Sequence, residues 1–417
     1  MDYFDINLDL TDEDKSIVNM AREFAREVIR PISIELDRMT AEEVVADGSP
    51  LWEFFRKAYE LDFHTILLPE VYGGPGLNPL QIHLVFEEFG WASFGLAVHL
   101  AVSSFPAYCA CMTGDDELVE TFVKPFCECR DGSIRGCWGI TEPEHGSDVI
   151  AVGEEFFSSP DLRGNVRVVQ DGDEWVINGQ KSAWVSGGTV ATHALLHCQI
   201  DPSLGFAGNG VCILPLDREG VSRGKPLEKI GQRDLNQGEI YFDDVRIPRN
   251  WMIVDPDFYV PMLDMILASA NLCMAAWATG VARAALEESL AYARQRIQGG
   301  KPLIEHYSMK QRIFELFRRT ETCRAVSRAA MNLNFNLSPP HLEYSLWSKT
   351  QCTDMAFQNT HESIQIFGAN GLTKEYFVEK LFRDARATLI EDGNNETLAR
   401  HGGHILGETY PRYPTIF

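Results

Sequence analysis

Apolar residues recur at helical spacing through the first part of the chain, residues 11–132. Ile17, Ala21 and Phe24 lie three or four positions apart, and other apolar residues continue this pattern. The segment Thr11–Asp14 offers a capping threonine followed by acidic residues, which is typical of a helix start. This part is therefore predicted to be all helical.

The pattern changes to short β-prone stretches over residues 133–248. Examples are 166–169, 174–177 and 211–214, which are rich in valine, isoleucine and other β-formers. Asp171-Gly172 and Asn178-Gly179 are expected to be turns between them. The middle part is therefore predicted to be a β-barrel or compact sheet domain.

Long helical patterns return in residues 249–417. Leu263, Ile266, Ala270 and Met274 recur at three-to-four spacing, with small residues between them that permit close helix packing. The predicted organisation is an N-terminal helical domain (1–132), a middle β domain (133–248) and a C-terminal helical domain (249–417).

Net charge limits the partners that this chain can have. The formal value of −23 repels nucleic acid, so a phosphorylated ligand needs locally positive groups or helix N-termini. The longest apolar runs are too short to predict a membrane span. The acidic start, residues 1–5, lacks the basic and apolar stretches of a secretory signal, which predicts a cytoplasmic protein or a mature organellar matrix form.

Ten cysteines are scattered along the chain without the spacing of a zinc site. They are expected to be small buried hydrophobic residues in a reducing compartment, and no metal site is predicted.

A loop rich in hydroxyls and turn residues, 138–148, begins the middle part and reads WGITEPEHGSD. On composition alone it is an ordinary interdomain turn, but residues 141–148 resemble the T-E-P-x-x-G-S-D signature of the acyl-CoA dehydrogenase family. Residues 68–76, 229–233 and 242–248 resemble further segments of that family in the same order. The resemblance implies its fold: an all-α N-terminal domain, a middle β-barrel domain and a C-terminal four-helix bundle. It also implies a homotetramer, an acyl-CoA or acyl-carrier thioester substrate, FAD as cofactor and electron-transfer flavoprotein as electron acceptor.

The same resemblance assigns cofactor contacts to residues along the whole chain. Residues 184–186 are similar to a W-I-T/S triplet beside the flavin ring, while 296–307 and 365–371 are similar to elements that reach the diphosphate and adenosine, the first of them in a neighbouring subunit. Departures occur at Gly187, Gly299 and Tyr307. The predicted cofactor-binding residues are Trp138, Ile140, Thr141, Ser147, Trp184, Val185, Ser186, Arg296, His306, Tyr307, Gln365, Gly368, Ala369, Asn394 and Glu396. Ser147 and Gly393 are also predicted to bind substrate.

The catalytic base is predicted from residues 375–396, which resemble the E-Y-x-V-E-K-x-x-R-D-A segment and the Y-E-G-T that follows it in medium-chain-type members. This register places Asp392 on the catalytic glutamate and Glu391 on the tyrosine before it. The other position that the family uses falls on Ala270, which offers no carboxylate. A short base predicts a branched, cyclic or otherwise unusual acyl group.

The implied reaction removes the α-proton of the thioester at Asp392 while the β-hydride passes to flavin N5, giving a 2,3-enoyl thioester. Glu391 is an alternative base, although neighbouring residues point in divergent directions. Asp392-Gly393-Asn394 with Ser269 is also compatible with a nitroalkane-oxidase-like flavoprotein. A redox-silent flavin-fold binding protein is the third alternative. The acyl pocket is expected among residues 86–108, although Trp91, Phe94, His99 and Phe105 are each better explained as core residues.

Overall fold

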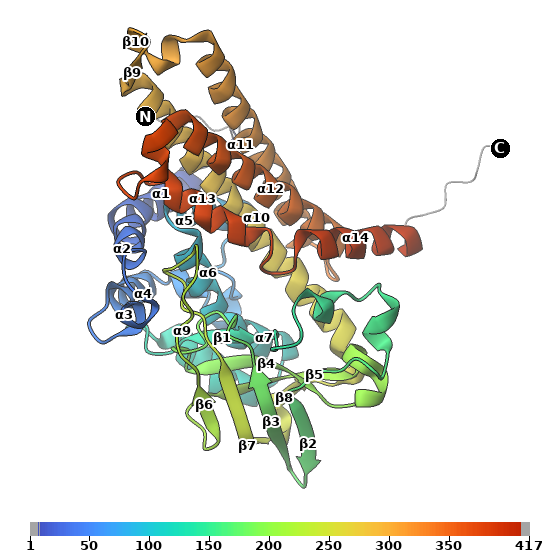
Figure 1. The fold of residues 1–417 in the computed structure, drawn as a ribbon. Coiled ribbons are helices and arrows are strands. Elements are labelled where there is room, and N and C mark those ends of the chain that lie inside the picture. The colour runs from blue at the N-terminus through green and yellow to red at the C-terminus, as the bar shows by residue number, and fades with distance from the viewer. Residues whose placement is uncertain (1–6, 8, 410–417) are drawn as a thin grey trace, which may run out of the picture.

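The computed structural model describes residue 7 and residues 9–409. Helices, strands and helices follow one another along the chain, and the three parts pack into one body (Figure 1). The predicted order of domains is therefore confirmed. The acidic residues 1–5, on which the predicted location depends, lie outside the described residues.

The first part begins with the predicted helix. Thr11 and Asp14 form a reciprocal capping box: the Thr11 backbone N–H donates to Asp14 Oδ2 (2.9 Å) and the Asp14 backbone N–H donates to Thr11 Oγ1 (3.1 Å). The helices are α1 (Asp12–Phe24), α2 (Arg30–Leu36), α3 (Ala41–Val45), α4 (Pro50–Glu60), α5 (Pro79–Ala92), α6 (Phe94–Ser103), α7 (Phe105–Thr113), α8 (Asp116–Leu118) and α9 (Lys124–Glu128).

The middle part forms one eight-stranded sheet in the order β6-β7-β3-β2-β4-β5-β8, with β1 paired to β4. The strands are β1 (Gly136–Gly139), β2 (Arg167–Asp171), β3 (Glu174–Lys181), β4 (His193–Gln199), β5 (Asn209–Pro215), β6 (Val221–Arg223), β7 (Ile240–Pro248) and β8 (Met252–Val254). Asp171-Gly172 lies at the β2–β3 connection, as predicted. The turn predicted at Asn178-Gly179 is wrong. These residues lie within β3, where the register with β7 shifts and Gly179 has a φ of +135°, so the glycine marks a bulge.

The last part is built on a 40-residue helix. Its helices are α10 (Pro256–Gln295), α11 (Tyr307–Asn334), α12 (Leu342–Phe367), α13 (Val378–Thr388) and α14 (Asn395–Thr409), and strands β9 (Ile297–Gln298) and β10 (Lys301–Pro302) form a small hairpin after α10. Small residues let α10 approach α5 closely: a Cβ at Gly280 would stand 2.2 Å from the Glu87 carbonyl oxygen.

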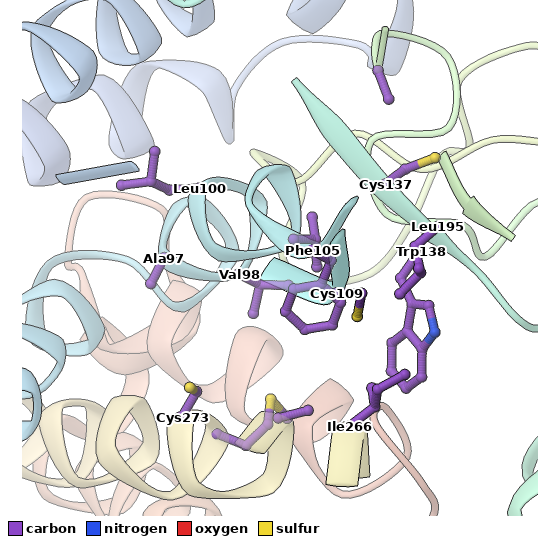
Figure 2. Close-up of a cluster of buried hydrophobic side chains, with 14 of the residues drawn as sticks. Ala97, Val98, Leu100, Phe105, Cys109, Cys137, Trp138, Leu195, Ile266 and Cys273 are labelled. Carbon is purple, nitrogen blue, oxygen red and sulfur yellow. The ribbon is translucent and has the colours of Figure 1, made fainter. Parts of the chain in front are cut away.

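Two helical stretches have the length and hydropathy of a membrane span, Phe94–Thr113 and Pro256–Gln295. In each, 89% of the apolar window is buried inside the protein, as in core helices of a folded domain. Figure 2 shows where they meet: side chains from α6, α7, β1, β4 and α10 form one apolar cluster. All ten cysteines are free and buried, as predicted.

Candidate active site

Asp392 lies in the short segment between α13 and α14 and is half-buried. Its φ is +49°, and that of Gly393 is +95°, so two consecutive residues adopt left-handed backbone conformations. A non-glycine residue is uncommon there, and strain of this kind is often found at functional sites.

Contacts from two other parts of the fold hold this segment. The Asn394 backbone N–H donates to Ser147 Oγ (3.0 Å), and Ser147 starts a short 3-10 helix in the middle domain. Lys349 of α12 donates to the Gly393 carbonyl oxygen (2.8 Å), and Asn271 of α10 donates to that of Asp392 (3.4 Å). The structure therefore brings together Ser147, Asp392, Gly393 and Asn394, four of the predicted site residues.

The electrostatics of this segment suit proton transfer near neutral pH. Burial raises the pKa of Asp392 to about 6, an effect that the Lys349 ammonium partly opposes. Burial and the neighbouring Asp392 raise the pKa of Glu391 to about 7. Burial lowers the pKa of Lys349 to about 8. A carboxylate with a raised pKa is better matched to accepting a proton from a weak carbon acid.

Glu391 and Asp392 face different surroundings. Gln232 donates its side-chain N–H to Glu391 Oε1, and its backbone N–H donates to Asp384, so Glu391 belongs to a polar network between domains. Both carboxylates interact electrostatically with Lys349, and Asp392 also interacts with the buried thiol of Cys273. Of the two, Glu391 is the one whose side chain accepts a hydrogen bond from Gln232.

The loop that carries the family signature is fixed by its glutamate. Glu142 Oε1 accepts from Lys181 Nζ (2.8 Å), and both side chains are buried. Lys181 Nζ also donates to the Ile140 carbonyl oxygen (3.1 Å), while the Thr141 carbonyl oxygen accepts from the Ser182 N–H (3.0 Å). Ile140 and Thr141 stay half-buried, so their side chains remain partly available at the edge of the sheet.

Trp138 is buried, and its indole N–H donates to His197 Nε2 (2.8 Å). The other ring nitrogen of His197 bonds the hydroxyl of Tyr259 (3.0 Å). His197 lies in strand β4 outside any recognisable motif, so the sequence did not predict that it would contact Trp138. Lys349 was missed for the same reason: only the packing of α12 brings it to the base.

Trp184, Val185 and Ser186 alternate in exposure. Trp184 has 57% of its surface exposed, Val185 is buried, and Ser186 Oγ accepts from the side-chain amide of Gln237 (3.2 Å). An indole left this exposed beside hydroxyl groups suits a large planar ligand, because covering it would remove apolar surface from water. The residues present therefore fit a flavin at this position.

A second group of predicted cofactor residues lies at the far end of the helical bundle, near the β9–β10 hairpin, away from the segment between α13 and α14 (Figure 1). Tyr307 is 87% exposed there. Its companions are exposed or half-buried: Arg296, His306, Gln365, Gly368 and Ala369. Within a single chain, this group of residues therefore does not lie close to Asp392. Glu396 lies near the base, where its backbone N–H donates to Asn394 Oδ1 (2.9 Å) at the start of α14.

The alternative position for the base carries no carboxylate. Ala270 is buried in α10, and Asn271 follows it, fully buried. Among the residues that the structure describes, no group of three or more His, Cys, Asp or Glu side chains is arranged to hold a metal ion. The predicted pocket residues Phe94, His99 and Phe105 are buried in the core, while Trp91 donates its indole N–H to Glu287 (2.8 Å).

Comparison with known proteins gives one consistent result. Three family descriptions match in order: acyl-CoA dehydrogenase N-terminal domain (11–130), middle domain (137–245) and C-terminal domain (262–406). A protein of Bacillus subtilis (strain 168) named probable acyl-CoA dehydrogenase YngJ is 31% identical over 94% of this chain and 97% of its own.

Two further relatives extend the comparison. Cyclohex-1-ene-1-carbonyl-CoA dehydrogenase of Geobacter metallireducens is 27% identical, covering 95% of this chain and 98% of its own. The solved structure of butyryl-CoA dehydrogenase from Megasphaera elsdenii matches with a TM-score of 0.83 at 27% identity, covering 97% of this chain and 100% of its own.

Proposed function

Because the chain belongs to the acyl-CoA dehydrogenase family, whose members are FAD-dependent oxidoreductases acting on CH–CH groups, we propose that Asp392 is the base that removes the α-proton of an acyl thioester. The observation that carries this proposal is the position of one carboxylate. Asp392 is half-buried, has a pKa raised to about 6, and belongs to a segment that is tied to Ser147 of the signature loop through the Asn394 N–H.

Proton removal from a thioester needs a base and stabilisation of the developing enolate oxygen. A carboxylate with a pKa near 6 is ionised at neutral pH and still accepts a proton more readily than an ordinary aspartate. Backbone N–H groups beside the base are suitable donors for the enolate oxygen, and we assign this role to the segment around Gly393. Partial burial lowers the effective dielectric around the carboxylate, which strengthens these interactions.

Residues from both groups of the predicted cofactor site would hold FAD. The near group of Thr141, Trp184 and Ser186 suits the flavin ring, and the far group around Arg296 suits the diphosphate and adenosine of a second subunit's cofactor. Bound FAD supplies a hydride acceptor at N5. This division of the site between two copies supports the proposal that the protein is a homotetramer, with electron-transfer flavoprotein as its oxidant.

The substrate is proposed to be an acyl-CoA with a branched or cyclic acyl group. Aspartate is one methylene shorter than glutamate, so it either approaches the α-carbon from a displaced backbone or meets a differently placed proton. The left-handed conformation of Asp392 supports an unusual approach. A relative that covers almost the whole chain is named for a cyclic acyl-CoA, which points to the same substrate class.

Anaerobic mixing of the FAD-loaded protein with straight, branched and cyclic acyl-CoAs tests this proposal, with bleaching of the flavin absorbance as the signal. Asp392→Asn is expected to retain FAD, and its rate of flavin reduction should fall by at least roughly 10³-fold. Glu391→Gln is the matched control: it neutralises the adjacent carboxylate and is expected to stay within about tenfold of the parental rate.

An Asp392→Asn protein that reacts at the parental rate contradicts the base assignment. A protein that is reduced by nitroalkanes and by none of the thioesters contradicts the substrate class. Flavin that no compound reduces contradicts both.

A further inference from the structure

The base segment is held by two buried donors from two different helices. Asn271 of α10 and Lys349 of α12 are both fully buried, and they donate to the consecutive carbonyl oxygens of Asp392 and Gly393. These are the two residues with left-handed backbone, at φ values of +49° and +95°. A strained conformation persists only where its surroundings fix it, so these contacts stabilise the geometry of the base.

Lys349 makes the stronger of the two anchors. Its ammonium lies 2.8 Å from the Gly393 carbonyl oxygen and 2.7 Å from Asn395 Oδ1, the first residue of α14. The lysine therefore ties the base segment to the start of the following helix. Among the described residues it forms a salt bridge with no carboxylate, although a buried lysine normally does so because an uncompensated charge is costly to desolvate.

We propose that Lys349 is a positioning residue for the Asp392 base. Its ammonium fixes the backbone of residues 392–395 and places a positive charge near the carboxylate without forming a direct ion pair with it. The proposal rests on the proposed function, because it assigns Lys349 a role in the same proton transfer. A direct ion pair would hold the carboxylate and weaken it as a base, whereas a charge anchored to the neighbouring carbonyl leaves the carboxylate free to receive a proton.

Several other charged or titratable groups surround this pair. Cys273 approaches Asp392 from α10, Glu391 precedes it in its own segment, and Asp354 approaches Lys349 from α12. Lys229 reaches Glu391 from the loop before β7. Of these, Lys349 is the group that lowers the pKa of Asp392, so removing its charge is expected to raise that pKa.

Lys349→Met tests the anchor and the charge together, because methionine keeps most of the side-chain volume. The expected results are retained FAD, flavin reduction slowed by about 10- to 100-fold, and a rate–pH profile displaced upward by roughly one pH unit. Hydrogen exchange is the readout independent of activity: the amides of residues 389–396 should exchange faster, including the Asn394 N–H that donates to Ser147. Thr350→Val is the matched control on α12, since this neighbour of Lys349 directs its hydroxyl to carbonyls of its own helix, at Leu346 and Trp347.

Asn395→Asp made together with Asp354→Asn separates charge from anchoring and also serves if Lys349→Met fails to retain FAD. Asn395 Nδ2 donates to Asp354 Oδ1 (3.0 Å), so exchanging the two side chains keeps an amide–carboxylate hydrogen bond and places the carboxylate directly against Lys349. The rate–pH profile should therefore move upward while exchange in residues 389–396 stays at the parental level. An unchanged profile in this double variant overturns the electrostatic role, and unchanged exchange in Lys349→Met overturns the anchoring role. If no acyl-CoA reduces the parental protein, the proposed function fails, and the exchange experiment still decides whether Lys349 fixes the loop.

Discussion

The backbone N–H of Asn394 donates to the hydroxyl oxygen of Ser147, so the end of the signature loop meets the segment that carries the proposed base. The two residues belong to the middle and C-terminal parts of the chain. This hydrogen bond links the signature loop directly to the segment of the proposed base. Its loss should therefore lower both the free energy of unfolding and the rate of flavin reduction.

Ser147→Ala is expected to lower the free energy of unfolding by about 1 kcal/mol, because it leaves the Asn394 N–H without its partner. Flavin reduction should slow as well, since the base segment loses one of its fixed points. Thermal unfolding and anaerobic reduction measure the two effects. Ser203→Ala is the control: its hydroxyl donates to Asp201 at an exposed position, so a change of at most about 0.5 kcal/mol is expected. Equal effects in both variants would argue against a special role for Ser147.

The rate of flavin reduction should rise with pH through the pKa of the base. Burial raises the pKa of Asp392 to about 6, and only the ionised carboxylate accepts a proton. Below that value the rate is expected to fall about tenfold for each pH unit, and above about pH 7 it should reach a plateau. Stopped-flow reduction between pH 5 and pH 8 measures this profile. A rate that is constant down to pH 5 would show that the base has an ordinary carboxylate pKa.

The order of the motifs along the chain predicted the domain order and part of the site. Contacts that depend on how the helices pack could not be predicted in this way. Ser147 and the pair Asp392-Gly393 come from two separate segments that resemble one family, so their meeting could be expected from sequence. Lys349 could not, because its contact depends on how α12 faces the segment after α13. Asn178-Gly179 shows the opposite error: its composition favours a turn, but pairing on both sides keeps it inside β3.

The far group of cofactor residues shows another limit of a single sequence. Arg296 and Tyr307 are exposed, and nothing in their spacing says which copy of the chain they serve. The resemblance supplied the neighbouring subunit, and Figure 1 agrees with that assignment, because the β9–β10 hairpin lies at the opposite end of the bundle from the segment between α13 and α14.

Gly393→Ala is expected to impair the site more than the small size of the change suggests. The φ of Gly393 is +95°, and a Cβ there would stand 2.5 Å from Leu398 Cδ2 and 2.7 Å from Ile150 Cδ1. Strain and crowding together should cost about 1–3 kcal/mol of unfolding free energy and slow flavin reduction. Denaturant unfolding provides the measurement. In Gly403→Ala, also a glycine-to-alanine change but inside α14 with no atom within 4 Å of the new Cβ, a gain of about 0.5–1 kcal/mol is expected.

Arg296→Ala tests whether the far group holds the cofactor. If Arg296 binds the diphosphate of a flavin, removing its guanidinium should weaken FAD retention by roughly tenfold or more, because charge-assisted hydrogen bonds to phosphate are strong. Flavin fluorescence released on dilution reports the loss, and light scattering must show an unchanged oligomeric state. Arg318→Ala is the control, since Arg318 is an exposed residue of α11 whose ion pair is with Glu315 of the same helix. Equal FAD retention in Arg296→Ala and the parental protein would place the diphosphate elsewhere. Equal loss in both variants would instead point to a general effect of reduced positive charge on a chain of net charge −23.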